Sequence, residues 1–318
     1  MKKYSKELIL LGLSLGFILF NLGFYLEVTR RYINNTSPEM QAKSVEVNKF
    51  LPFAADSGIF KLDSASKLEG DLPKIDGAAA LFPVFSAFVH AIYPESSVQM
   101  QGAEFAPNSA LQYHNTRGAY RAIVDGEVDI IMVARPSKEQ LQYAQDKGVE
   151  LEFVPIGYEA FVFLVNKNNP VNNLSVQEIR NIYTGKIKKW SQVGGENRYI
   201  QALSRNQGSG SQTQMLKFMQ DEKINKHLMG YFGSPIGFSF RYYVEGLVAD
   251  SQVKMLSVNG FYPDKDNIAS GKYPIVGEIV LVYNKKNPNP NIAKLVQWAV
   301  SAEGQKIIAE SGYIPLGQ

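Results

Sequence analysis

The chain has 318 residues, of which 45% are hydrophobic and 20% charged, and its formal net charge is +3. This length allows two compact lobes plus an extension. Acidic and basic residues are interspersed, without the basic stripe and interleaved aromatics that a nucleic-acid partner requires, so we expect no nucleic acid. The absence of cysteine excludes disulfides, thiolate metal sites, cysteine nucleophiles and a lipid-bearing cysteine.

The N-terminal segment is long and apolar enough to cross a bilayer. After a basic start, the stretch from Leu8 to Leu26 is apolar except for Ser14 and Asn21, which is close to the roughly 20 residues of a membrane-spanning helix. Residues 27–32 carry charges instead of a small-residue cleavage site, which favours an uncleaved anchor over a cleaved signal, and both readings stay open. Because basic residues flank the segment on both sides, they orient it only weakly.

The rest of the chain divides into a lead-in and a body. Residues 29–71 are mixed in polarity and predict a stalk, and from Leu72 onward the pattern alternates between strand, turn and helix. Apolar runs at 128–133, 160–165 and 276–283 are typical of buried strands, and the stretch from Ile292 to Glu310 has helical spacing. This alternation predicts an α/β architecture with ligand sites at the carboxyl ends of strands.

The similar apolar runs near residues 160 and 280 predict that the chain crosses to a second lobe and then returns. We therefore expect residues 1–28 to be the anchor or signal and residues 29–71 the stalk and lead-in. Lobe 1 is expected to comprise residues 72–160 plus 277–318, and lobe 2 residues 161–276.

The segment from Arg205 to Thr213 is the most informative one for function. A turn rich in small and hydroxyl residues opens a predicted helix, and the N–H groups at a helix N-terminus form an anion site. Ser209 and Ser211 can add hydroxyl donors, and Arg205 can add a planar fork matched to an oxyanion. The alternative is a capping serine with a surface arginine nearby.

Two further segments are weaker candidates. Thr116 stands where it could cap a helix and donate to a ligand, and Arg135 follows directly on the apolar run that ends at Val133. Helix caps and turns after strands are common in all folds, so each could equally be structural. For Arg135 the alternatives are a positive charge at the site and a salt-bridged surface arginine.

Sequence motifs of enzymes are missing. Gly208-Ser209-Gly210-Ser211 is not the elbow of a hydrolase, and the chain has no G-x-x-x-x-G-K-[ST] loop. The histidines at 90, 114 and 227 have no metal-ligand spacing. We expect no catalytic residues, no metal and no cofactor.

Taken together, the motifs resemble the phosphate-binding proteins of Pst-type ABC transporters, and the resemblance extends from about Leu72 to Leu316. The motifs that carry it are, in chain order, Gly77-x5-Pro83, Thr116, Val128-Asp129 with Arg135, Ile156–Phe161, Ile179–Ile187 with Trp190, Arg205-x3-Ser209-Gly210-Ser211, Ile236–Phe240, and Gly304-Gln305 with Tyr313–Leu316.

This resemblance implies a two-lobed, periplasmic-binding-protein-like fold of type II that closes over a dehydrated oxyanion. It implies phosphate or a related oxyanion as ligand, ABC permease subunits as partners, and an extracytoplasmic binding domain. With the apolar N-terminal segment, we therefore expect a single-pass protein of the cell membrane. The expected ligand-binding residues are Ala80, Leu81, Thr116, Arg135, Arg205, Ser209, Gly210 and Ser211.

The chain departs from the family at two places. The turn that often carries hydroxyl residues is Ala78-Ala79-Ala80, and the position where some relatives have an acidic residue is Ala134. A carboxylate there would accept the proton of a phosphate and repel sulfate. The alternative function is therefore a membrane-anchored anion sensor or scaffold without a transport role.

Overall fold

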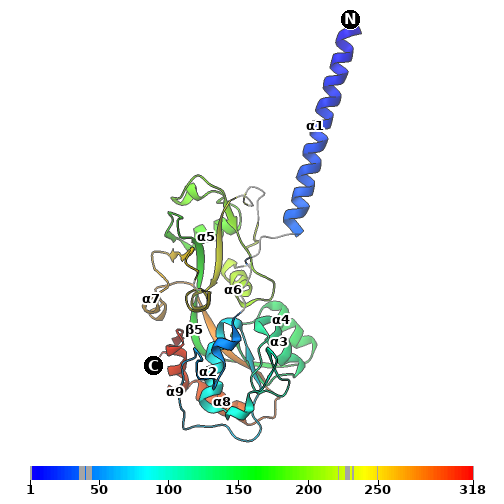
Figure 1. Cartoon of the computed structure of the whole chain (residues 1–318). Helices are drawn as coiled ribbons and strands as arrows, with labels where there is room; N and C mark the ends of the chain where they lie inside the picture. The colour runs from blue at the N-terminus through cyan, green and yellow to red at the C-terminus, as the bar shows by residue number, and fades with distance from the viewer. Residues whose placement is uncertain are drawn as a thin grey trace.

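A single long helix precedes the body of the protein in the computed structural model. The structure describes residues 2–35, 40, 45–220, 222–225, 230, 233–248 and 250–317. Helix α1 spans Lys2–Asn35 and projects away from the body (Figure 1). Its segment Lys6–Val28 is long and apolar enough to cross a membrane, and none of it is buried against the body. The predicted N-terminal apolar helix is thus present, as a candidate anchor or signal sequence.

One mixed sheet runs through the whole body. Its strands lie in the order β1-β4-β11-β5-β8-β7, and β9 and β12 also pair with β5. β1 and β4 are parallel, as are β7 and β8, whereas β11 is antiparallel to both β4 and β5. The strands are β1 Ile75–Gly77, β4 Ile130–Ala134, β5 Leu151–Asn166, β7 Ile200–Ala202, β8 Ser234–Phe240, β9 Val253–Met255, β11 Val276–Asn284 and β12 Ile314–Pro315.

Strand β5 is shared by the two halves of the body. Its first part, from Leu151 to Ala160, pairs with β11, and its second part, from Phe161 to Val165, pairs with β8. Two small sheets complete the strands, β2 Met100–Gln101 with β3 Glu104–Phe105, and β6 Asn173–Leu174 with β10 Ser257–Val258.

Helices pack on the sheet, and several begin at capping residues visible in the sequence. In α4 the Ser137 hydroxyl accepts the N–H of Gln140 at 3.2 Å while the Gln140 side chain accepts the N–H of Ser137 at 2.8 Å, and Ser175 and Glu178 repeat this capping box in α5. The α-helices of the body are α2 Phe82–Ile92, α3 Asn115–Asp125, α4 Lys138–Asp146, α5 Val176–Tyr183, α6 Gly210–Met219, α7 Lys265–Ala269, α8 Asn291–Ala299 and α9 Ala302–Glu310. The short 3-10 helices are η1 Val47–Phe50, η2 Ala79–Leu81, η3 Glu95–Ser97 and η4 Trp190–Val193, and η6 Tyr243–Val248 is a π-helix.

The buried apolar residues form two separate clusters. The first takes residues from Val45 to Ile156 and from Ile279 to Tyr313, and the second takes residues from Ala160 to Ile275 together with Ile314. We call the halves around these clusters lobe 1 and lobe 2. The predicted α/β architecture is confirmed.

The described part of the predicted stalk from Val45 onward packs on lobe 1. Val45, Ile59 and Leu68 belong to its buried cluster. The carbonyl of Phe50 accepts a hydrogen bond from the Ser86 hydroxyl of α2 at 2.5 Å. Residues 45–68 are therefore part of the folded body.

Candidate functional site

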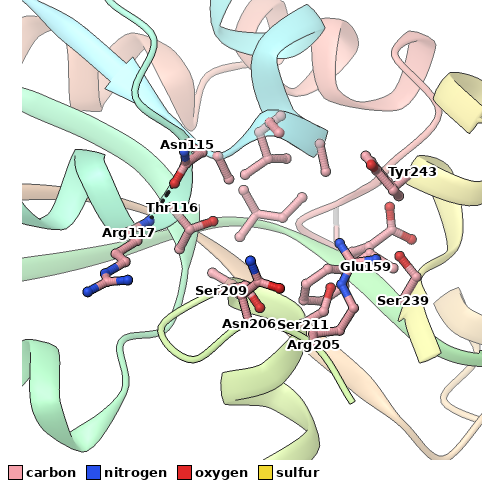
Figure 2. A pocket seen from close by; sticks show the side chains of 18 of the residues that line it. Asn115, Thr116, Arg117, Glu159, Arg205, Asn206, Ser209, Ser211, Ser239 and Tyr243 are labelled. Carbon is pink, nitrogen blue, oxygen red and sulfur yellow. Dashed lines mark hydrogen bonds between the residues drawn. The ribbon is translucent and has the colours of Figure 1, made fainter. Parts of the chain in front are cut away.

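A cavity of about 580 Å³ lies where the two lobes meet (Figure 2). Lobe 1 lines it with the turn after β1, the start of α3, the end of β4 and the start of β11, and lobe 2 lines it with the loop before α6 and the end of β8. The lining residues are Ala78, Ala79, Ala80, Leu81, Tyr113, Asn115, Thr116, Arg117, Ala134, Glu159, Arg205, Asn206, Gln207, Ser209, Gly210, Ser211, Ser239, Phe240, Tyr243, Glu278, Ile279 and Tyr313.

The loop from Arg205 to Ser209 enters α6 through a left-handed turn. Gly208 has a φ of +79°, which a side chain would disfavour. The Ser209 hydroxyl caps the helix by accepting the N–H of Gln212 at 3.2 Å, and the Gln212 side chain accepts the N–H of Arg205 at 2.9 Å. This exchange holds the loop against the helix start.

The same loop offers hydrogen-bond donors to the cavity. The N–H groups of Gly210 and Ser211 are in the first turn of α6 and have no intrahelical acceptor. The Ser209 hydroxyl uses a lone pair for its cap, so its proton stays available to a ligand. Within the part of the chain that the structure describes, no carboxylate pairs with the guanidinium of Arg205. Positive charge, hydroxyls and the positive end of a helix thus converge on one corner.

The start of α3 approaches this corner from lobe 1 (Figure 2). Asn115 adopts a left-handed conformation, with a φ of +54°, and its side chain accepts the N–H of Arg117 at 3.1 Å. The hydroxyl oxygen of Thr116 lies 3.4 Å from where a Cβ on Gly210 would stand. Thr116 and the first residue of α6 are therefore neighbours across the two lobes.

The alanine turn forms another wall of the cavity. The N–H of Ala78 donates to the carbonyl of Met132 at 2.9 Å, which fixes the turn on β4. The N–H of Leu81 already donates to the carbonyl of Ala78 at 2.9 Å, so Leu81 contributes its side chain and not a backbone donor. The N–H of Ala80 precedes the first bond of this turn and has no acceptor within it.

Arg135 does not line the cavity, unlike the other seven residues expected at the site. Its Nε donates to a carboxylate oxygen of Glu278 at 2.6 Å, and its guanidinium lies over the ring of Phe153, 5.5 Å from the centroid. The prediction that Arg135 binds the ligand is therefore wrong, and the alternative interpretation, an arginine in a salt bridge, is confirmed. Its charge is neutralised by a carboxylate that itself lines the cavity.

Asp76 and His114 position the site, and the sequence analysis did not single them out for it. Asp76 is the middle residue of β1 and has no exposed surface, and one of its oxygens accepts the N–H groups of Gly77 at 2.6 Å and His114 at 2.9 Å. Its other oxygen lies 2.8 Å from the ring Nδ1 of His114. This hydrogen bond raises the pKa of His114, against the opposing effect of burial. The pair ties the alanine turn to the start of α3.

Glu159 and Arg241 form a second pair that sequence reasoning missed. Glu159 is 3% exposed and stands on β5 next to the point where the strand changes lobes. One of its oxygens accepts the N–H of Ala160 at 2.9 Å and lies 3.6 Å from Nε of Arg241. Burial raises the pKa of Glu159, and the charge of Arg241 opposes this shift.

Arg241 links the lobes through a further contact. It follows β8 and donates to the carbonyl of Gly312 in the C-terminal segment and to the carboxylate of Glu245. Glu159 and Gly312 lie far from Arg241 in the chain, so no short sequence pattern brings them to it.

A metal centre has no basis in the described residues, because among them no three histidine, aspartate or glutamate side chains come together in a group that could hold an ion. What the cavity can do chemically is bind an anion through preformed N–H and O–H donors and the guanidinium of Arg205.

Comparison with known proteins identifies a family and related folds. Residues 70–303 match the model of the PBP superfamily domain. The phosphate-binding protein PstS of Borreliella burgdorferi is 28% identical over 205 residues, covering 56% of this chain and 68% of that protein. Protein SphX of Synechococcus elongatus is 24% identical over 295 residues, covering 84% of both chains.

Two solved structures share the fold. A Clostridium perfringens protein with bound phosphate has a TM-score of 0.57 at 22% identity, covering 80% of this chain and all of that one. An ABC-type phosphate transport receptor from Vibrio cholerae has a TM-score of 0.53 at 20% identity, covering 76% of this chain and 99% of that one. The family match extends over most of the body, and the curated relatives include Pst-type phosphate-binding proteins. The chain therefore belongs to the PBP superfamily, and within it resembles the Pst-type phosphate-binding proteins.

Proposed function

We propose that this protein is an extracytoplasmic solute-binding protein that captures phosphate or a related oxyanion for an ABC importer. The observation that carries the proposal is the convergence of Arg205, Ser209 and the start of α6 on the cavity, with Thr116 facing them from the other lobe. An oxyanion in this corner would accept charge-assisted bonds from the arginine and neutral bonds from the hydroxyls and N–H groups. The names of the relatives, a phosphate-binding protein and a phosphate transport receptor, support phosphate as the ligand.

Binding in this proposal involves no covalent chemistry. The donors come from both lobes, so a ligand that contacts them all favours the arrangement in which the lobes are together. An importer that recognises this arrangement would distinguish loaded from empty protein. The lobe boundaries that we expect, residues 72–160 plus 277–318 and residues 161–276, are supported by the separation of the two core clusters.

The protein in this proposal stays at the membrane through α1, as a single-pass protein with its body outside the cytoplasm. The length and apolar composition of Lys6–Val28 support a membrane span. An anchored binding protein needs no lipid-bearing cysteine, which this chain lacks.

Calorimetric titration of the full-length chain in nanodiscs tests the proposed ligand. Phosphate, sulfate, molybdate and tungstate are titrated in turn, and we expect saturable binding of phosphate at one site per chain. Binding of another oxyanion in place of phosphate would change the ligand and keep the site. No binding of any of the four would contradict the proposal and favour a sensor or scaffold.

A further inference from the structure

We propose that the cavity takes a singly substituted phosphoryl group, a phosphate monoester or phosphonate, with the oxyanion at the Arg205–Ser211 loop and the organic substituent against an apolar wall. This inference rests on the proposed function and narrows its substrate class. The apolar wall consists of Ala79, Leu81, Phe240 and Ile279, all of which line the same cavity.

The size of the cavity is the first argument. Even if each of the five heavy atoms of inorganic phosphate took the ~30 Å³ that one water molecule occupies in the liquid, the ion would fill ~150 Å³. The cavity measures about 580 Å³, which is in the range of sites for whole organic ligands. Most of its volume would stay unfilled around an inorganic ion.

The lobes already touch beside the anion corner, so the cavity has this volume in a structure whose hinge is not fully open. The side chain of Gln140 in α4 donates to the carbonyl of Gly208 at 3.3 Å, and the side chain of Gln207 donates to the carboxylate of Glu139. The cavity is thus large while contacts between the lobes are in place.

The distribution of polar groups is the second argument. A bare oxyanion taken out of water needs donors around all of its oxygens, and each unsatisfied oxygen is costly. Here the Arg205–Ser211 loop and Thr116 gather donors in one corner, and Asn115, Ser239 and tyrosine hydroxyls add polar groups elsewhere on the lining. The turn after β1, in contrast, presents three alanine side chains without any hydroxyl. A substituted phosphoryl group has one direction that accepts no hydrogen bonds, and the apolar wall suits that direction.

Phe240 is placed where such a substituent would leave the oxyanion. Its ring carbon Cε2 lies 3.6 Å from the Cβ position of Gly210, the first residue of α6. A phosphoryl group held by the N–H groups of that helix start has the ring directly beside it. Aromatic rings contribute large contact areas to apolar and aromatic groups.

The experiment compares inorganic phosphate with phenylphosphonate by calorimetry on the full-length chain in nanodiscs. We expect phenylphosphonate to bind at one site, at least as tightly as phosphate, and to be displaced by it. Arg205→Ala should weaken the binding of both ligands, and this result would show that the phenyl ring alone does not drive binding. Phenol, which carries the ring without the oxyanion, is the control ligand and should not compete.

Two variants test the apolar wall. Phe240→Ala should lower the affinity for phenylphosphonate about tenfold more than the affinity for phosphate. Because Phe240 also packs on Phe161, with ring centroids 5.8 Å apart, a second variant keeps the core intact. Ala79→Ser adds a donor to the wall and should shift the preference toward phosphate.

The outcomes separate the two proposals. Phosphate binding with phenylphosphonate weaker than phosphate would overturn the substrate class and leave the proposed function standing. Binding of phenylphosphonate without phosphate would uphold the substrate class and correct the ligand of the proposed function. Binding of neither would overturn both.

Discussion

Arg205 and Arg135 illustrate how local pairing decides the role of a side chain. Arg135 does not line the cavity: its Nε forms a salt bridge with a carboxylate oxygen of Glu278 at 2.6 Å, and its guanidinium lies over the ring of Phe153. Arg205 lines the cavity, and its backbone is held by Gln212 at 2.9 Å, which fixes where the side chain emerges. A guanidinium whose charge is not already compensated attracts an oxyanion more strongly than one in an ion pair.

Replacing Arg205 with alanine should weaken phosphate binding by roughly tenfold or more, because a charge-assisted, two-pronged contact is lost. Titration calorimetry of the full-length variant measures the change. Arg198→Ala is the matched control, since Arg198 is an exposed arginine of the same lobe that lies 3.9 Å from Glu196. An unchanged affinity in folded Arg205→Ala protein would remove this residue from the site.

His114 should make stability depend on pH. Its hydrogen bond to Asp76 raises its pKa above the ordinary value in the folded state. A raised folded pKa means that the stabilisation is fully present below the unfolded pKa and is lost as the pH rises through the folded pKa. Denaturant unfolding should therefore show a larger loss of stability for His114→Gln at about pH 5.5 than at about pH 8.

His90 is the internal control for this pH dependence because its pKa is shifted in the opposite direction to that of His114. Burial lowers its pKa, and its ring Nδ1 accepts the N–H of Phe53 at 3.3 Å, which requires that nitrogen to be unprotonated. The loss of stability in His90→Gln should therefore grow as the pH rises. The same pH trend in both variants would contradict the assignment of either histidine.

At the scale of elements, the start of α6 serves both the fold and the site. Ser209 caps α6 and lines the cavity, whereas Ser175 caps α5 through the same type of bond at the surface of the same lobe. Ser175→Ala and Ser209→Ala should each cost about 1 kcal/mol of stability through loss of the cap. Denaturant unfolding measures this loss.

The two cap variants should differ in binding. Only Ser209→Ala removes a hydroxyl donor from the cavity, so only this variant should bind phosphate more weakly in the same calorimetric assay. Equal affinities of the two variants would mean that Ser209 is a cap and nothing more. A loss of affinity in Ser175→Ala would instead point to a general loosening of lobe 2.

The sequence predicted those parts of the site that depend on local patterns. Capping serines, the glycine of the turn and the apolar runs of the strands can all be recognised within a few residues, which is why the α6 loop and Thr116 were found. The Asp76–His114 and Glu159–Arg241 pairs join residues 38 and 82 positions apart. Only the fold brings such residues together, so no spacing in the sequence could reveal them.

Arg135 is another residue whose contacts could not be predicted from local sequence patterns. Its place after a buried strand was visible, but its partner Glu278 comes from β11, an antiparallel strand 143 positions away. The sequence therefore could not choose between a charge at the site and a surface ion pair.

At the scale of the whole molecule, β5 joins the two halves as one continuous strand. It pairs with β11 in one half and with β8 in the other, so at this crossing the halves are joined by paired strand. Glu159 and Arg241 lie at this change of partners, and Arg241 also contacts Gly312 of the C-terminal segment. Movement of one lobe against the other must bend the sheet at this point, which makes these side chains sensitive to the arrangement of the lobes.

The attachment of the body to the membrane gives the last prediction. If α1 is an uncleaved anchor, the mature protein keeps its N-terminal segment and sediments with membranes after alkaline washing. The apolar surface of Lys6–Val28, with no contact to the body, would otherwise face water over its whole length, which is strongly unfavourable.

Intact-mass measurement of the protein recovered from cells decides between anchor and signal. A chain that begins at residue 1 and stays in the washed membrane fraction supports the anchor, and replacing residues 1–28 with a cleavable signal should then release the body without changing its affinity for phosphate. A mass that lacks the apolar segment would instead make it a cleaved signal. The body would then be free to diffuse, and capture would no longer be confined to the layer of solvent next to the permease.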